Sequence, residues 1–242
     1  LYTSEPYIKA CKKLEIPIII YERGINKYSA KEINLSGYVS VSIPMSDAIY
    51  KSVVDQGVKA KKIIRIYDGI NEKEMAPTKS AAEIRKEFNI PEKSKIIGII
   101  GNVKPWKGQE YFVKAMIKLC QGNDDIYALI AGAWKEKDLD FKKNLDKLIE
   151  DAGFSERIIF TGYRTDVANI LSILHVFVHA STKPEPFGMV VPEAMAAKVP
   201  VIATNFGGPV ESLDHGSCGI LVEPKNEDEI YKACLKYILD EH

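Results

Sequence analysis

The sequence lacks the features that mark several large classes of protein. Its 33 lysines and arginines are balanced by 33 aspartates and glutamates, so the formal net charge is zero. A protein dedicated to binding nucleic acid normally carries a net basic charge, so we expect no nucleic-acid partner. No apolar run approaches the roughly 20 residues that a membrane-spanning helix needs, and no signal peptide is visible. We therefore expect a soluble, cytoplasmic protein.

Cysteine is scarce, and no two cysteines form a C-x-x-C pair. The four are Cys11, Cys120, Cys218 and Cys234. This wide spacing favours free thiols in a reducing compartment over disulfides or a metal site. An initiating methionine is also missing, because the sequence opens at Leu1. We therefore expect a fragment of a longer protein.

Short runs rich in isoleucine and valine recur along the whole chain, as expected for parallel strands that are buried on both faces. The runs are 16–21, 38–43, 62–67, 95–100, 126–131, 157–161, 175–180, 200–204 and 219–222. Stretches with helical spacing lie between them. One places Tyr111, Phe112, Ala115, Met116 and Leu119 on one face, and another does the same with Leu139, Leu145, Leu148 and Ile149. This alternation predicts an α/β fold with doubly wound parallel sheets.

One charged stretch, from residue 72 to residue 94, contains no strand-like run and has a short helical pattern between Pro77 and Pro91. We interpret it as the boundary between two Rossmann-like units. The predicted domains are 1–71, a linker at 72–93, and 94–242. The N-terminal unit has only three predicted strands and is incomplete, so we expect missing residues or another chain to complete it.

The strongest functional signal is the segment 182–204, TKPEPFGMVVPEAMAAKVPVIAT. A predicted strand ends near Ala180, and a loop with Glu185 and Gly188 leads into a helix that carries Glu193. Ligands of doubly wound sheets bind at the carboxyl ends of the strands, where a helix N-terminus can hold a diphosphate. The two carboxylates are better explained as acceptors for hydroxyl groups of a sugar and a ribose.

A second signal is the segment 95–116, in which Gly101, Lys104, Lys107 and Gly108 follow a predicted buried strand. Glycines and lysines at a strand-to-helix turn are typical of a phosphate-binding loop. Taken alone the signal is weak, because the P-loop pattern G-x-x-x-x-G-K-[ST] is absent. The G-x-G-x-x-G pattern is absent too, which argues against a nicotinamide enzyme.

These segments together resemble the donor-binding domain of glycosyltransferase family 4, whose members have the GT-B fold. The resemblance runs from about Ile96 to Leu239 and is carried by GNVKPWKG, LIAG, IIFTGY, EPFGMVVPEAMAAKVPVIAT, GGPVE and GILVEP. Glu185 and Glu193, with seven residues between them, reproduce a hallmark spacing of the family. The segments 16–24, 39–49 and 63–71 are similar to the second half of the family's acceptor domain.

The resemblance implies a retaining transfer from a nucleotide-diphosphate sugar to a carbohydrate or lipid-linked acceptor, without a metal or other cofactor. Glu185 would accept hydroxyls of the donor sugar, Glu193 would hold the ribose, and Lys107 would neutralise the departing diphosphate. The backbone N–H groups of Phe187, Gly188, Met189 and Val190 would contact the sugar and diphosphate. Tyr163 and Arg164 would border the nucleobase. Gly101, Asn102 and Lys104 complete the predicted donor site.

Some residues depart from the family pattern or have plainer explanations. Asn102 stands where many members carry arginine, and Lys104 would substitute as the second cation. His175, where the family often has aspartate, and His179 are interpreted as structural, and Trp106 as a lid or surface aromatic. Arg23 could face the cleft, where many members have histidine. Gly207 and Gly208 fit either a simple turn or a ligand-facing loop.

The leading hypothesis is a glycosyltransferase of the hexosyltransferase type. One alternative is a catalytically silent nucleotide-sugar-binding module, and another is an epimerase with the GT-B fold. The basic stretch 51–65 would suit an anionic acceptor or a peripheral contact with an anionic membrane, although such a stretch is more often a solvated helix end.

Overall fold

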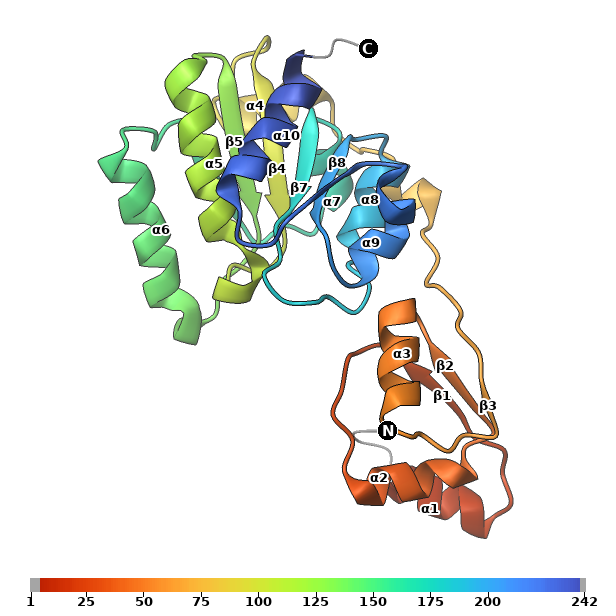
Figure 1. Cartoon of the computed structure of the whole chain (residues 1–242). Helices are drawn as coiled ribbons and strands as arrows, with labels where there is room; N and C mark the ends of the chain where they lie inside the picture. The colour runs from red at the N-terminus through yellow and green to blue at the C-terminus, as the bar shows by residue number, and fades with distance from the viewer. Residues whose placement is uncertain (1–4, 240–242) are drawn as a thin grey trace. The chain divides into compact units, whose positions relative to one another are not determined.

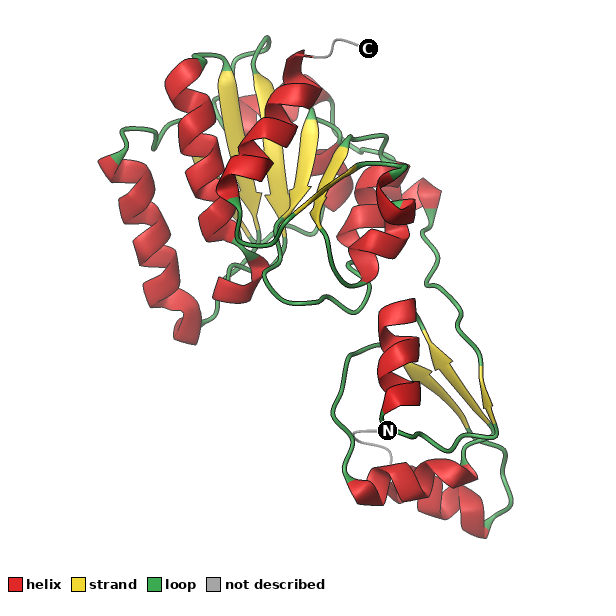
Figure 2. Ribbon diagram, in the orientation of Figure 1, coloured by secondary structure: helices red, strands yellow, loops and turns green. Residues whose placement is uncertain are grey.

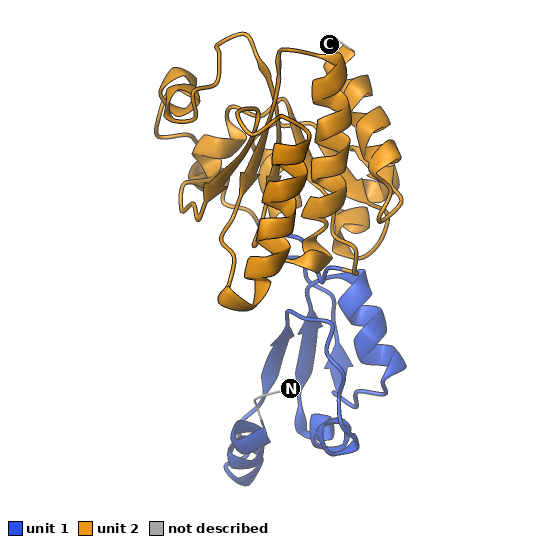
Figure 3. Cartoon of the chain, turned by 90° about the vertical axis from the view of Figure 1, so that its left-hand side faces the viewer, with its two compact units in different colours: residues 1–69, 185–188 blue, residues 70–184, 189–242 orange. Residues whose placement is uncertain are grey.

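A computed structural model describes residues 5–239 of the chain. Contacts within the chain divide it into two compact units, which Figure 3 shows in blue and orange. The first unit contains the described residues up to Gly69 together with Glu185–Gly188. The second contains Ile70–Pro184 and the described residues from Met189 onward. We describe each unit by itself.

The first unit is a three-stranded parallel sheet with short helices. Its strands β1 (Ile19–Glu22), β2 (Val41–Pro44) and β3 (Lys62–Ile63) pair in the order β1-β2-β3. Its helices are α1 (Glu5–Lys13), α2 (Ala30–Leu35) and α3 (Asp47–Asp55), with a 3₁₀ turn η1 (Ser36–Tyr38). Among the described strands β1 pairs only with β2, and its Ile19 is 66% exposed. Completion of this unit by further residues or another chain stays a prediction.

The second unit contains a six-stranded parallel sheet (Figures 1 and 2). The strands are β4 (Lys95–Ile100), β5 (Ile126–Ala131), β6 (Ile158–Gly162), β7 (Val176–His179), β8 (Val201–Thr204) and β9 (Ile220–Val222). They pair in the order β6-β5-β4-β7-β8-β9, so the direction of chain progression reverses between β4 and β7. Each of the nine runs predicted as strands overlaps a strand, which confirms the parallel α/β architecture.

Helices cover both faces of this larger sheet, as Figure 2 shows. The helices are α4 (Ala81–Glu87), α5 (Gln109–Gly122), α6 (Leu139–Asp151), α7 (Val167–Leu171), α8 (Val190–Ala196), α9 (Gly208–Ser212) and α10 (Glu227–Leu239). Short 3₁₀ turns are η2 (Glu72–Met75), η3 (Pro105–Lys107), η4 (Glu136–Asp138) and η5 (Asp214–Gly216). In parallel strands, alternate residues face opposite sides, so each strand contributes to two hydrophobic clusters.

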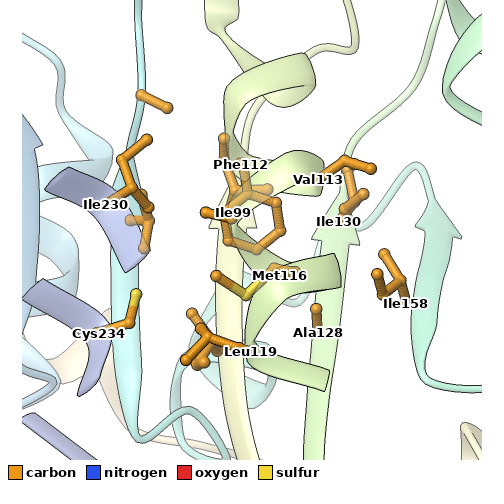
Figure 4. Close-up of a cluster of buried hydrophobic side chains, with 14 of the residues drawn as sticks. Ile99, Phe112, Val113, Met116, Leu119, Ala128, Ile130, Ile158, Ile230 and Cys234 are labelled. Carbon is orange, nitrogen blue, oxygen red and sulfur yellow. The ribbon is translucent and has the colours of Figure 1, made fainter. Parts of the chain in front are cut away.

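The first cluster lies under α5, α6 and α10 (Figure 4). It contains Phe112 and Met116 of α5, Ile99 of β4, and Cys234 of α10. The second cluster lies on the other face and includes residues of α4, α7 and α8 with Ile96 of β4. Adjacent residues of one strand, Ile96 and Ile97, therefore belong to different clusters, which explains the continuous apolar runs in the sequence.

The two predicted helices form, with one difference at a boundary. Of the five apolar residues predicted on one face of α5, Phe112, Ala115, Met116 and Leu119 are fully buried and Tyr111 is partly buried. In α6, Leu145 and Ile149 are buried, but Leu139 is 37% exposed. Leu139 is the first residue of the helix, directly after η4, and the packed face begins further along.

The segment 72–93, expected as a linker, packs into the second unit. Its helix α4 begins with a capping box, in which the Ser80 hydroxyl accepts from the Glu83 N–H and the Glu83 carboxylate accepts from the Ser80 N–H. Ile84 and Ile90 belong to the second hydrophobic cluster and are at most 5% exposed. The sequence did not reveal these two anchoring residues, because most residues of the segment are charged or polar.

His175 connects β4 to β7 through both its backbone and its side chain. Its N–H donates to the Ile96 carbonyl at 2.8 Å, and its Nδ1 accepts from the Ile96 N–H at 3.0 Å. Burial, together with the positive charges of Lys95 and Arg85, lowers the pKa of His175 below its ordinary value of 6.5. A neutral imidazole that accepts a backbone hydrogen bond is the structural role expected from the sequence.

This pKa shift predicts a loss of stability in mild acid. The folded chain binds the His175 proton less readily than the unfolded chain, so stability falls as the pH drops below 6.5. The variant His175→Asn keeps an acceptor for Ile96 but does not titrate, so we expect it to lose less stability between pH 7.5 and pH 5.5. Urea unfolding at both pH values measures the difference. The exposed His215, replaced in the same way, is the control for the loss of a histidine.

Candidate functional site

The reversal of strand order between β4 and β7 marks where a ligand site is expected in the second unit. In open parallel sheets, ligands bind outside the carboxyl ends of the strands at such a reversal, because the two connections diverge there and leave a crevice. The connection after β4 is the predicted phosphate loop that ends at Gly108. The connection after β7 begins at Ala180 and leads to α8. The two strongest functional signals in the sequence therefore follow the two strands of the reversal.

These two connections approach each other closely. A side-chain carbon added at Gly108 would lie 1.8 Å from the Ala180 carbonyl oxygen, so only glycine fits. Gly108 also has φ +76°, in the left-handed region that favours glycine. Nearby, the Thr182 N–H donates to the Trp106 carbonyl at 2.8 Å. The loop after β4 is thus held against the segment after β7.

Lys107 and Gly101 come together inside this loop. A side-chain carbon at Gly101 would lie 3.9 to 4.0 Å from the end of the Lys107 side chain. The Nζ atoms of Lys104 and Lys107 lie 4.5 and 4.7 Å from the centroid of the Trp106 ring. Asn102 is exposed, and its carbonyl accepts from the Gln109 side chain at 3.1 Å. The loop therefore presents two ammonium groups around one aromatic ring, beside a glycine that leaves the backbone accessible.

Glu193 lines a pocket of about 460 Å³ in the second unit. It lies in the first turn of α8 and is half-buried, and burial raises the pKa of its carboxyl group. The rest of the lining comes from residues 74–78, around η2, and from residues 165–169, after β6. A pocket of this size accommodates a ring system such as a nucleoside, and a carboxylate in its wall can accept hydrogen bonds from hydroxyl groups.

Arg164 takes part in ion pairs beside this pocket. Its Nε lies 2.8 Å from an Asp166 oxygen, and its Nη1 contacts the Glu87 carboxylate. Tyr163 is 73% exposed. Asp166 itself lines the pocket, so Arg164 orients one wall while residues 165–169 form it. A direct contact of Tyr163 or Arg164 with a nucleobase stays a prediction.

The sequence did not predict two parts of the pocket wall, namely residues 74–78 and Asn169. Asn169 is 2% exposed, and its Oδ1 accepts from the N–H groups of Thr78 at 2.7 Å and Lys79 at 3.2 Å. It thereby joins the segment after η2 to α7. The interpretation of 72–93 as a linker concealed this wall. The available signal in the sequence was that Asn169 is the one polar residue of the helix VANIL, residues 167–171.

The predicted residues Glu185, Phe187 and Gly188 lie in the connection between β7 and α8, and their contacts group them with the first unit. The Phe187 ring stacks on Tyr67, with 5.7 Å between the centroids. Gly188 has φ +78°, which glycine adopts without strain. Met189 precedes α8, and Val190 is its first residue. The donor-binding roles of these residues stay predictions.

The remaining candidates have identifiable partners or positions. Arg23, in the first unit, lies 2.7 Å from Asp68, and its side chain is 64% exposed. Gly207 has φ +75° and precedes α9, which begins at Gly208, so these glycines form a helix entry. The His179 Nε2 and Ser181 hydroxyl are 3.3 Å apart at the buried end of β7.

Two properties bear on cofactors and membranes. Across residues 5–239, no three or more histidine, cysteine, aspartate or glutamate side chains gather as a metal site would require. In the same range, no helix combines the length and apolar character needed to cross a bilayer.

The sequence profile of the family described as glycosyl transferases group 1 matches residues 80–242, more than half of the chain. The chain has the α/β, GT-B-like glycosyltransferase fold with parallel sheets. The chain belongs to the group 1 glycosyltransferases.

Two curated relatives illustrate the similarity. The chain is 34% identical over 152 residues to a lipopolysaccharide core biosynthesis mannosyltransferase of Rhizobium meliloti, covering 63% of this chain and 43% of that protein. It is 30% identical over 215 residues to N-acetyl-alpha-D-glucosaminyl L-malate synthase of Bacillus anthracis, covering 86% and 54%. The chain thus spans about half the length of these relatives.

A solved structure of Anabaena HepE in complex with UDP and glucose is also similar. It superposes with a TM-score of 0.87 at 26% identity, covering 97% of this chain and 65% of that one.

Proposed function

We propose that the chain binds a nucleotide-diphosphate sugar, and that the whole protein transfers the sugar, with retention and without a metal, to a carbohydrate or lipid-linked acceptor. The observation that carries this proposal is the pocket of about 460 Å³ that contains Glu193, in a unit whose phosphate-loop lysine lies at the strand reversal. The UDP and glucose bound to Anabaena HepE and the mannosyltransferase relative support the same class of donor.

Each proposed role follows from the chemistry of the group. The half-buried Glu193 carboxylate accepts from ribose hydroxyls, which replace the water that burial removes. Lys107 neutralises the diphosphate, whose negative charge grows as the bond to the anomeric carbon breaks. Glu185 accepts hydroxyls of the transferred sugar, and the N–H groups from Phe187 to Val190 contact the sugar and diphosphate. The catalytically silent binding module remains the alternative, because the chain covers about half of its relatives.

The test is calorimetric titration of the chain with UDP, GDP and ADP, each without added metal. We expect one of them to bind, and the variant Glu193→Gln to bind it roughly 10- to 100-fold more weakly, since a hydrogen bond to a charged group contributes about 1.5–3 kcal/mol. The exposed Glu150→Gln is the matched control. Release of sugar from the matching donor, or its transfer, distinguishes an enzyme from a silent module.

The same variant gives a second readout that does not involve a ligand. Burial raises the pKa of Glu193, so its charged form destabilises the fold at neutral pH. Glu193→Gln should therefore be more stable than the parent at pH 7, and this gain should vanish as the pH falls below 4.5, where the carboxyl is protonated in both states. If no nucleotide binds to a demonstrably folded chain, or if Glu193→Gln binds as tightly as the parent, the assignment of this pocket is wrong.

A further inference from the structure

The second unit has another pocket, of about 450 Å³, also at the carboxyl edge of its sheet. Its lining comes from the connections that follow β4, β5, β7 and β9 and from the first turn of α5, and it shares no residue with the pocket that contains Glu193. The residues important here are Lys104, Trp106, Tyr111, Lys137, Lys183 and Lys225. Donor binding as proposed above leaves this pocket unexplained.

The pocket is built on a fixed wall. Thr182, which lines it, donates its N–H at 2.8 Å and its hydroxyl at 3.3 Å to the Trp106 carbonyl. Close packing of Gly108 on Ala180 holds the same two connections together. The position of the Trp106 ring therefore depends on backbone contacts between two connections, which favours a preformed surface over a chance gap between mobile side chains.

Positive charge dominates the lining. Its four lysines are accompanied by two carboxylates, and one of these, Glu110, is paired with Lys114 at 2.6 Å. The other carboxylate is Asp138. Lys137, Lys183 and Lys225 are exposed, and no ion pair joins them to a carboxylate within residues 5–239. A concave surface with this excess of ammonium groups attracts anions.

The N-termini of nearby helices add to the positive electrostatic potential of the pocket. Three long helices, α5, α6 and α10, begin beside the lining residues at Gln109, Leu139 and Glu227. Helix N-termini carry a partial positive charge. The first turn of α10 opposes it with Glu227, Asp228 and Glu229, although Asp228 pairs with Lys118 at 2.5 Å. The excess of lysines in the lining remains.

Two aromatic rings complete the lining. Trp106 and Tyr111 both line the pocket, and the Lys104 Nζ lies 4.5 Å from the Trp106 ring centroid. An aromatic ring offers a flat apolar surface that packs against the C–H face of a pyranose, while neighbouring ammonium groups bind a phosphate. We propose that this pocket binds a phosphate-bearing carbohydrate, independently of the nucleotide site, with Lys137, Lys183 and Lys225 holding the phosphate and Trp106 the sugar ring.

The experiment uses the fluorescence of Trp106 in the whole chain. The other tryptophan, Trp134, is replaced by phenylalanine, so that Trp106 is the single reporter. Glucose 6-phosphate is titrated, with glucose and inorganic phosphate in parallel. We expect saturable binding of glucose 6-phosphate, at least fivefold weaker binding of each fragment, and no displacement by saturating UDP, GDP or ADP.

The double variant Lys137→Glu/Lys183→Glu should weaken glucose 6-phosphate binding at least tenfold, while Lys147→Glu, an exposed charge reversal on α6, should not. Equal affinity in the double variant, complete displacement by nucleotide, or inorganic phosphate binding as tightly as the sugar phosphate would each overturn the proposal.

A last experiment measures binding of the chain to vesicles that contain phosphatidylglycerol. If they bind through the same lysines while glucose 6-phosphate does not, the site recognises a lipid headgroup and the proposal is wrong. Nucleotide titrations of the same variants test the donor site separately.

Discussion

Replacing Gly108 by alanine is expected to destabilise the second unit by about 3 kcal/mol and to abolish nucleotide binding. Its new methyl group would lie 1.8 Å from the Ala180 carbonyl oxygen and 2.6 Å from the carbonyl carbon. Both atoms belong to the backbone, so no side-chain rotation relieves the overlap. The φ of +76° adds about 1 kcal/mol of strain for any residue with a side chain. Thermal unfolding should show a fall in Tm of roughly 10 °C.

A matched control separates the two causes. Gly153 has nearly the same conformation, with φ +77°, but a methyl group there would meet no atom within 4 Å. Gly153→Ala therefore measures the left-handed strain alone, and the excess loss in Gly108→Ala measures the overlap of the two connections. Equal losses in the two variants would show that the loop after β4 can move away from Ala180. Nucleotide titration of both variants then tells whether donor binding requires that approach.

Fold class was accessible from the sequence because the strands are buried on both faces. A strand such as 95–100, KIIGII, needs apolar residues on each side, so its signal is a continuous run that is distinct from the helical spacing of 109–122. The observed strand is shorter than the predicted one where the later residues of an apolar run are exposed. The run 62–67 forms only the two-residue strand Lys62–Ile63, and its later residues Ile66 and Tyr67 are exposed.

The positions of the site residues were harder to predict, because they depend on strand order. Nothing local in the sequence says that β4 pairs with β7, yet this pairing brings the loop that ends at Gly108 against the segment after Ala180. Asn169 illustrates the same limit, since its partners Thr78 and Lys79 lie about 90 residues away in the chain. The glycines and lysines indicate a phosphate loop, but the pairing of strands determines which groups face it.

Lys104 and Lys107 lie on one loop but have different surroundings. Both lie near the Trp106 ring, but the three atoms nearest to a side-chain carbon added at Gly101 belong to Lys107, whereas Lys104 lines the second pocket. The sequence suggested the donor diphosphate as the partner of both. In the arrangement proposed above, the Trp106 ring lies at the border between a nucleotide site and a site for a sugar phosphate. Substitutions of the two lysines should then affect different ligands.

Lys107→Met is expected to lower the rate of sugar transfer by the whole protein roughly 10²- to 10³-fold, with a smaller effect on donor affinity. Methionine keeps an unbranched apolar chain against the Trp106 ring but removes the charge that we propose to stabilise the departing diphosphate. A group that acts mainly on charge developing in the transition state affects kcat more than KM, and removal of one such group typically costs this much.

The variant Lys107→Arg distinguishes catalysis from packing. It keeps the positive charge but changes the geometry of the donors, so we expect it to recover a measurable part of the lost rate. Lys143→Met, at an exposed position on α6, controls for the general loss of a lysine. Steady-state kinetics of the four proteins, with the donor identified by the nucleotide titrations, give the comparison. If arginine and methionine reduced kcat equally, Lys107 would serve only to pack against Trp106, and the diphosphate would need another cation.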